Sequence, residues 1–215
     1  MKVILLAAGC SQRMGQAKQL LKWNDKSMLQ HCLDKLQRCN LDIILVIGAF
    51  SNEIKASLEK PYEILENPQW SSGMGSSIAL GMSQLNNDDK AVMIMLADQP
   101  AITEVDIKKL ISSWKPNPDR ICCSYSEQII EGNEPQKLLR VPAIFPWQYF
   151  SKLSNLEENT GAKAILKSES DNLIKVAMPN TLININTTDD WNHWLQQLAT
   201  QQVIQEDTKD EIYAE

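Results

Sequence analysis

The sequence predicts an α/β protein whose mostly parallel sheet is covered by helices on both faces. Apolar runs of strand length alternate along the chain with segments whose apolar residues recur at helical spacing, and this order is typical of parallel sheets. A chain of 215 residues, 43% of them hydrophobic, is long enough to bury one substantial core. We therefore expect one domain over residues 1–198, followed by a disordered, acidic tail over residues 199–215.

The N-terminal half of the chain contains the clearest alternation of strands and helices. Apolar runs predict strands at residues 2–7, 41–47, 62–66 and 91–96. One face of a helix between the first two strands is marked by Met28, Leu29, Cys32, Leu33 and Leu36. A second helix is expected over residues 76–85, between the third and fourth strands, so that strand and helix alternate throughout this half.

The C-terminal half begins with a well-marked helix. Thr103 is predicted as its N-cap with Asp106 at the third helical position, and the helix should end at Trp114, ahead of Pro116. The polar segment 127–137 predicts an exposed loop or hairpin that faces a ligand. Further strands are expected at residues 121–125, 141–145, 173–176 and 182–185, and further helices at residues 160–166 and 188–198.

Composition excludes several classes of function. A net charge of −6 argues against general nucleic-acid binding, which needs a basic face. No apolar run approaches the ~20 residues that cross a bilayer, and the run at the start ends too early for a signal peptide. Five cysteines without a CxxC pair, together with two histidines, favour reduced, buried thiols over a zinc site. We expect a cytoplasmic protein that binds neither nucleic acid nor membrane.

The turn after the first predicted strand has the residue types of an anion site. It lies at the carboxyl edge of the expected sheet, where backbone N–H groups can receive a phosphate. Ala7, Ala8 and Gly9 allow a ligand to approach the backbone, and Arg13 and Lys18 can both reach a polyphosphate. A plain strand–turn–helix connection is the competing interpretation. The Walker loop and the G-x-G-x-x-G fingerprint both fail on the spacing of the glycines and the lysine.

The segment "LLAAGCSQRMGQAKQLL" resembles the signature L-A-A-G-x-S-x-R-M-G-x-x-K of nucleotidyltransferases of the MobA-like type. All its fixed positions are filled, by Leu6, Ala7, Ala8, Gly9, Ser11, Arg13, Met14, Gly15 and Lys18. The resemblance implies a three-layer α/β/α sandwich, Rossmann-like, of the nucleotide-diphospho-sugar transferase type. It also implies that the loop wraps a nucleoside triphosphate, while Arg13 and Lys18 act in catalysis by offsetting charge on the leaving pyrophosphate.

Two further segments resemble parts of the same family. "ADQP" resembles its metal-binding G-D-Q-P segment, so that Asp98, at the end of a predicted strand, would bind Mg²⁺ and act in catalysis; a turn-forming Asp before Pro100 is the alternative. "ENPQWSSGMGSS" resembles the N-P-x-W-x-x-G segment of molybdopterin cytidylyltransferase-like proteins, although Ser76 can also serve as a plain N-cap. The resemblance implies nucleotide contacts from Leu6, Ala7, Ala8, Gly9, Ser11, Gly15, Asn67, Gly73, Ser76 and Ser77.

The last two matching regions depart from the family pattern. "NINTTDDW" resembles the closing D-I-D-T-P-E-D of cytidylyl members, with Asn184 and Asn186 in place of the acids; Asn186 can still bind Mg²⁺ through its amide oxygen. Hydrogen bonding at a strand edge is the alternative. "RVPAIFPWQYF" resembles the acceptor-side segment G-H-P-V-L-F, with Arg140 and Val141 in place of Gly-His. This departure bears on which acceptor the protein takes.

The resemblance of these segments implies an Mg²⁺-dependent nucleotidyltransferase. It would move a nucleoside monophosphate, CMP from CTP, onto a phosphorylated acceptor, the molybdopterin cofactor, and release pyrophosphate; a molybdoenzyme is a possible partner. One alternative is a nucleotidyltransferase that acts on a sugar phosphate or on methylerythritol phosphate. The other is a nucleotide-binding cofactor chaperone without catalytic activity.

Overall fold

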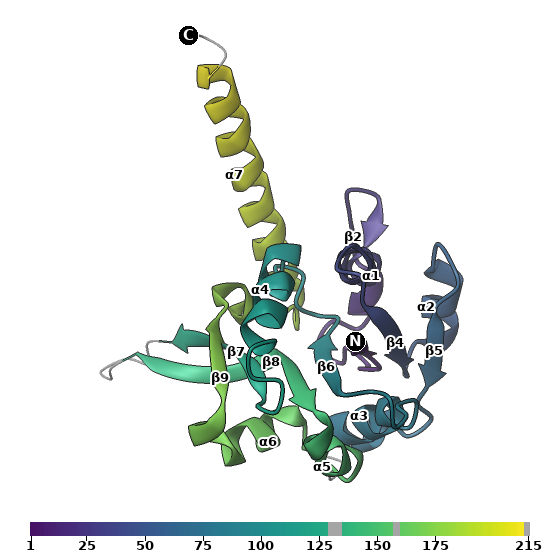
Figure 1. Ribbon diagram of the computed structural model, residues 1–215. Helices are drawn as coiled ribbons and strands as arrows, with labels where there is room; N and C mark the ends of the chain where they lie inside the picture. The colour runs from purple at the N-terminus through teal and green to yellow at the C-terminus, as the bar shows by residue number, and fades with distance from the viewer. Residues whose placement is uncertain (129–134, 157–159, 213–215) are drawn as a thin grey trace.

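The computed structural model describes residues 1–128, 135–156 and 160–212, with side chains described up to residue 200. A seven-stranded sheet in the order β5-β4-β1-β6-β8-β7-β9 forms its centre (Figure 1). The strands are β1 (Lys2–Ala7), β4 (Asp42–Ile47), β5 (Glu63–Glu66), β6 (Ala91–Leu96), β7 (Cys122–Gln128), β8 (Gln136–Pro146) and β9 (Ile174–Ala177). Strand β8 is antiparallel to both of its neighbours, and the other pairs are parallel, so the expected mostly parallel sheet is confirmed.

Helices cover both faces of this sheet, as the alternating side chains of β1 require. Val3 and Leu5 point into one apolar cluster and Ile4 and Leu6 into another. Helices α1 (Met28–Arg38), α2 (Ser51–Ser57) and α4 (Glu104–Trp114) contribute to the first cluster. Helices α3 (Met74–Met82), α5 (Phe150–Ser154) and α6 (Ala162–Ser168) contribute to the second, on the opposite side in Figure 1. The three-layer arrangement is therefore confirmed.

Local sequence signals account for the ends of two helices. Thr103 Oγ1 accepts a hydrogen bond from the Asp106 N–H at 3.1 Å, and the Asp106 carboxylate accepts one from the Thr103 N–H at 2.9 Å. This capping box starts α4 as predicted, and the helix ends at Trp114. Helix α3 starts at Met74, two residues earlier than predicted, because Gly73 is its N-cap and Ser76 lies in its first turn.

The predicted strand over residues 182–185 is wrong. The short 3₁₀ helix η5 (Pro179–Leu182) occupies its start, and the next residues pair with no strand. Asn184 Nδ2 instead donates to the Thr181 carbonyl at 3.1 Å, and the Ile185 N–H donates to the Asp98 carbonyl at 2.9 Å. One of these hydrogen bonds is local and the other joins residues distant in the sequence. Because they use polar groups of the segment, they take the place of the hydrogen bonds of a strand.

Helix α7 (Thr188–Ile212) continues 14 residues past its predicted end at Leu198. Residues 199–212 contain no glycine or proline to end a helix, and their backbone is helical. The disorder expected for the tail over residues 199–215 stays a prediction. That this segment lies outside the domain stays a prediction, and residues 213–215 lie outside the described residues. In Figure 1 the helix projects away from the sheet.

Smaller elements complete the structure. At the two ends of the predicted segment 127–137, Glu127 pairs with Lys137 and Gln128 with Gln136, across the antiparallel strands β7 and β8. Residues 129–134 lie outside the described residues, and a ligand that faces this segment stays a prediction. A short hairpin was not expected. It consists of β2 (Lys22–Trp23) and β3 (Lys26–Ser27). The remaining 3₁₀ helices are η1 (Lys18–Leu20), η2 (Trp70–Ser72), η3 (Trp147–Tyr149) and η4 (Ser170–Asn172). Within the described residues, no helix is long and apolar enough to cross a membrane.

Candidate active site

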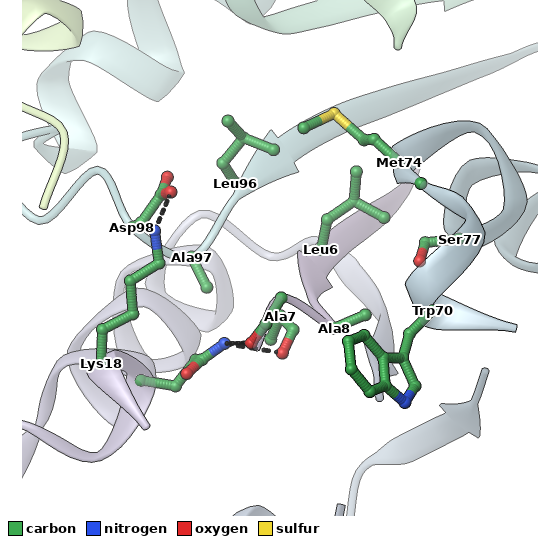
Figure 2. Close-up of a pocket in the computed structure, with 13 residues that line it drawn as sticks. Leu6, Ala7, Ala8, Lys18, Trp70, Met74, Ser77, Leu96, Ala97 and Asp98 are labelled. Carbon is green, nitrogen blue, oxygen red and sulfur yellow. Dashed lines mark hydrogen bonds and ion pairs between the residues drawn. The ribbon is translucent and has the colours of Figure 1, made fainter. Parts of the chain in front are cut away.

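A cavity of about 270 Å³ opens at the carboxyl edge of the sheet, where β1 and β6 end side by side. Strand β1 leads into Ala8 and Gly9, and β6 leads into Ala97 and Asp98, which places both predicted motifs on one cavity. Figure 2 shows Lys18 and Asp98 on one side, with Trp70 and Ser77 on the other. We call it the first cavity; it is lined by Leu6, Ala7, Ala8, Gly9, Lys18, Gln19, Trp70, Gly73, Met74, Ser77, Leu96, Ala97 and Asp98.

Lys18 lies at the meeting point of three distant segments. Its ammonium donates to Asp98 Oδ2 at 2.6 Å, to the Ile185 carbonyl at 2.9 Å and to Asn186 Oδ1 at 3.2 Å. These three acceptors match the three N–H donors of an ammonium. The Lys18 side chain is 12% exposed and that of Asp98 20% exposed, so water screens this ion pair only in part. The predicted catalytic and metal-binding residues Lys18, Asp98 and Asn186 therefore form one cluster.

The donor set around Lys18 suits a hard divalent cation. Asp98 Oδ1 is buried and has no hydrogen-bond partner among the described residues, although a buried carboxylate oxygen needs one. Asn186 Oδ1 and the Ile185 carbonyl add two neutral oxygen atoms, and Mg²⁺ prefers oxygen ligands of these kinds. The described residues contain no group of three or more acidic, histidine or cysteine side chains, so Asp98 would be the charged ligand.

Gln19, which was not predicted, fixes the backbone on which the cavity is built. Its side chain is 2% exposed, and its Nε2 donates to the Ala7 carbonyl at 2.9 Å and to the Gly9 carbonyl at 3.1 Å. These two bonds hold the end of β1 in place and leave the N–H groups of the turn to other partners. The signal for Gln19 in the sequence was weak, because a lone glutamine followed by two leucines fits an amphipathic helix.

Part of the predicted signature shapes the loop without lining the cavity. Ser11 and Gly15 have positive φ angles of 50° and 65°, a region that favours glycine at residue 15. Ser11 Oγ accepts from the Lys18 N–H at 3.2 Å, which ties the loop to η1. Arg13 is exposed beside Asp190, outside the residues that line the cavity. The nucleotide contacts of Ser11 and Gly15 and the catalytic role of Arg13 stay predictions, as do the nucleotide contacts expected of the residues that line the cavity.

The opposite wall comes from the loop before α3. Asn67, which is 3% exposed, donates from its Nδ2 to the hydroxyls of Ser76 and Ser77, each at 2.9 Å. Asn67 and Ser76 thus support the wall, whereas Gly73 and Ser77 line it. A Cβ atom on Gly48 would lie 2.6 Å from Trp70 Cβ and 2.7 Å from the Ala8 carbonyl oxygen. Glycine at this position therefore lets the Trp70 loop approach β1.

A second cavity, of about 160 Å³, adjoins the first. Met74 and Leu96 line both cavities. The segments that hold Lys18 also reach it, because Gln99 follows Asp98 and Asn184 precedes Ile185. It is lined by Met74, Ile94, Leu96, Gln99, Leu139, Arg140, Val141, Gly161, Ala162, Lys163 and Asn184.

The start of α7 positions the closing segment. The Asp190 carboxylate accepts from the Asn186 N–H at 2.9 Å and from the Thr187 N–H at 2.8 Å, which caps the helix. Burial works to raise the pKa of Asp190, but these hydrogen bonds, with lesser help from the charge of Arg13, hold it below its usual value. Trp191 and Trp194 pack with Ile185 in a small apolar cluster, which anchors the segment that contacts Lys18.

His31 and the five cysteines lie outside the lining of the first cavity. The His31 ring stacks on Trp23, with ring centres 3.7 Å apart, and burial as the largest cause lowers its pKa. All five cysteines are free, and three of them are buried. Burial raises the pKa of Cys122 and of Cys123 to about 12, which keeps both thiols protonated at neutral pH. None of these groups lines the first cavity.

Comparison with known proteins adds family information to this geometry. The MobA-like NTP transferase domain matches residues 3–173. A probable molybdenum cofactor guanylyltransferase of Rhodopirellula baltica is 26% identical over 87% of this chain and 88% of its own length. The nicotine blue oxidoreductase of Paenarthrobacter nicotinovorans and the molybdenum cofactor cytidylyltransferase of Escherichia coli are each 31% identical over about half of this chain. The chain spans 56% and 58% of the lengths of these two proteins.

Solved structures share the fold. A homologue of Rv0371c from Mycobacterium sp. strain JC1 has a TM-score of 0.75 at 23% identity, over 93% of this chain and 96% of its own. Rv0371c of Mycobacterium tuberculosis, in a complex with manganese, has a TM-score of 0.68 at 20% identity, over 91% and 97%. At these identities the comparison supports the predicted three-layer sandwich, and the activity is argued from the residues of the site.

Proposed function

We infer that this chain, which belongs to the MobA-like NTP transferase domain family, moves a nucleoside monophosphate from a nucleoside triphosphate onto a phosphorylated acceptor. The observation that supports this proposal most strongly is the cluster of Lys18, Asp98 and Asn186, in which Lys18 and Asp98 line the first cavity. It combines a cation for phosphate with oxygen ligands for a metal, beside a turn of small residues. Phosphoryl chemistry requires such electrostatic groups more than a nucleophilic side chain.

In the proposed reaction, the nucleotide lies in the first cavity with its phosphates toward Lys18. An oxygen of the acceptor phosphate attacks the α-phosphorus in line, so that a new P–O bond forms as the bond to pyrophosphate breaks. Lys18 offsets the charge that develops on pyrophosphate, with Arg13 at the rim of the loop. The small side chains of Ala7, Ala8 and Gly9 let the triphosphate approach the backbone N–H groups. No covalent enzyme intermediate is needed.

Asp98, Asn186 and the Ile185 carbonyl are the groups proposed to hold Mg²⁺. When bound, the metal neutralises phosphate oxygens as a Lewis acid. The unpartnered Asp98 Oδ1 supports this assignment. The manganese named in the Rv0371c structure is consistent with a divalent ion in a protein of this fold.

We propose CTP as the nucleotide and molybdopterin as the acceptor. The similarity to a protein named molybdenum cofactor cytidylyltransferase and the N-P-x-W segment before α3 support this choice. A molybdoenzyme would then be the partner that receives the product. The alternatives are a sugar phosphate or methylerythritol phosphate as acceptor, and a nucleotide-binding chaperone without turnover. The relative named as an oxidoreductase adds redox turnover as an outcome to be tested.

The test has two stages. A thermal-shift screen of the four nucleoside triphosphates with Mg²⁺ should raise the melting temperature for the nucleotide that binds, CTP if the proposal holds. Pyrophosphate release is then measured with that nucleotide and molybdopterin, methylerythritol 4-phosphate or glucose 1-phosphate. Release should require one acceptor and should fall steeply in folded Lys18→Ala and Asp98→Ala variants. Full release in these variants, or binding without turnover for every acceptor, would contradict the proposal.

A further inference from the structure

The second cavity is lined by a cation, Arg140, for which the described residues supply no counter-charge. Arg140, on β8, lines the cavity and is partly buried. None of the ion pairs among the described residues includes it. Burial lowers the pKa of its guanidinium, and no acidic group among residues 1–128, 135–156 and 160–200 opposes this effect. A partly buried charge without a counter-charge is costly for a folded protein, so its presence calls for a partner.

The guanidinium of Arg140 is held in position by neutral groups. Its Nε donates to Ser126 Oγ at 2.8 Å, and the Ser124 hydroxyl donates to the Arg140 carbonyl at 3.0 Å. Both serines are buried, at 0% and 2% exposure. An arginine has five N–H donors, and the bond to Ser126 uses the one on Nε. The Nη donors therefore remain for a ligand that can accept two parallel hydrogen bonds, such as a phosphate or carboxylate.

The remaining walls of the cavity suggest the rest of the ligand. Lys163 adds a second cation at an exposed position, whereas Ile94, Leu139 and Val141 present apolar surface. Gln99 is 2% exposed, and its Nε2 donates to the Val141 carbonyl at 3.2 Å, while its Oε1 has no partner among the described residues. The cavity thus combines two cationic side chains with an apolar surface and one unused polar acceptor.

We propose that Arg140 is a specificity-determining residue, which binds an anionic group of the acceptor in the second cavity. This inference rests on the proposed function, because it takes the second cavity as the acceptor side of the reaction. Its position supports that role, since Met74 and Leu96 are common to both cavities and Gln99 follows the metal-binding candidate Asp98. The resembling family pattern has Gly-His where this chain has Arg140 and Val141. The contact from Arg140 would therefore be specific to this chain.

The decisive experiment isolates the second cavity. The first cavity is filled with Mg²⁺ and α,β-methylene CTP, and phenyl phosphate, an apolar ring with one dianionic group, is titrated by calorimetry. The wild-type chain should bind it, and Arg140→Gln should weaken binding at least tenfold. Arg140→Lys should restore part of the affinity, because it keeps the charge but loses the paired donors. Arg120→Gln is the matched control and should leave binding unchanged, since Arg120 bonds to backbone carbonyls on residues 172 and 173. Benzoate, titrated in parallel, distinguishes a carboxylate site from a phosphate site.

The experiment distinguishes a failure of the proposed function from a failure of the role proposed for Arg140. If the nucleotide analogue does not bind, the proposed function fails, and the phenyl phosphate titration without nucleotide still tests Arg140. If the analogue binds but wild type and Arg140→Gln bind phenyl phosphate equally, or wild type binds neither anion, the role of Arg140 is refuted. With an active acceptor, Arg140→Gln should raise the acceptor KM at least tenfold while the nucleotide KM changes less than twofold. A parallel rise in both constants in a variant of unchanged melting temperature would also overturn the inference.

Discussion

The two adjoining cavities hold their cations in opposite ways. In the first cavity, Lys18 donates to a carboxylate and two neutral oxygens, all from the protein. In the second, Arg140 bonds to a neutral serine and has no carboxylate within an ion-pair distance among the described residues. The first cavity is built from motifs that resemble a family, and the second departs from that pattern. If both proposals hold, the class of reaction and the choice of acceptor depend on separate parts of the chain.

The largest expected effect comes from breaking the first cavity. Asp98→Asn keeps a hydrogen-bond acceptor for Lys18 but removes the one carboxylate among the proposed metal ligands. Mg²⁺ would then bind less tightly, and the charge of the phosphates would no longer be neutralised. We expect the rate of pyrophosphate release to fall about 100- to 1000-fold, as is typical of a lost group that stabilises the transition state. Steady-state kinetics measure this, with the exposed Asp88→Asn as the control. A variant that keeps more than half of the wild-type rate would remove Asp98 from the mechanism.

A second prediction concerns the cation that the protein itself places at the oxygen cluster. Replacing Lys18 with Met removes an ammonium 2.6 Å from Asp98 Oδ2, and this ammonium competes with any divalent ion. Without nucleotide, the affinity for Mn²⁺, followed by electron paramagnetic resonance, should rise about tenfold, the size of one charge-assisted hydrogen bond. Turnover should fall in the same variant. Weaker Mn²⁺ binding would show that Lys18 supports the metal ligands and does not compete with the metal.

Gln19→Leu sharpens the comparison, because it should damage the first cavity alone. The variant leaves the Ala7 and Gly9 carbonyls without their side-chain donor, at a cost of about 1–3 kcal/mol per unsatisfied group. We expect the nucleotide KM to rise about tenfold and the acceptor KM to stay within twofold of wild type. A rise in both constants would mean that the cavities do not act separately. Gln37→Leu, at a partly exposed helical position, is the control for the substitution itself.

The sequence predicted some residues of the site and missed others. Lys18 and Asp98 were predicted, because each lies in a contiguous motif beside an apolar strand, and β1 and β6 have the predicted bounds. Gln19 was missed because its role depends on two backbone carbonyls, which carry no residue signature. The Ile185 carbonyl was missed for the same reason, and its segment was predicted as a strand. Arg140 was noted as a departure, but its missing counter-charge required the packing of β7 against β8.

The smallest expected effect is on stability and its pH dependence. Asp190→Ala removes the cap of α7 and should lower the free energy of unfolding by about 1 kcal/mol at neutral pH. Because the folded-state pKa of Asp190 lies below its unfolded value, its contribution is complete above the ordinary aspartate pKa of about 3.9 and is lost as the pH falls through the folded-state pKa. Denaturant unfolding should therefore show wild type and variant converging at acid pH. A constant difference would assign the effect to packing alone.

The central claim, that the first cavity presents the α-phosphate of a nucleotide to an acceptor in the second, is tested most directly by following that phosphate. CTP labelled in the α-phosphate is incubated with Mg²⁺ and each acceptor in turn, and the products are separated. The account predicts that the label appears on one acceptor in step with pyrophosphate release, and that Asp98→Asn prevents both. Label that stays in CTP with every acceptor, while CTP binds in the first cavity, would contradict it and favour a protein that binds nucleotides without transferring them.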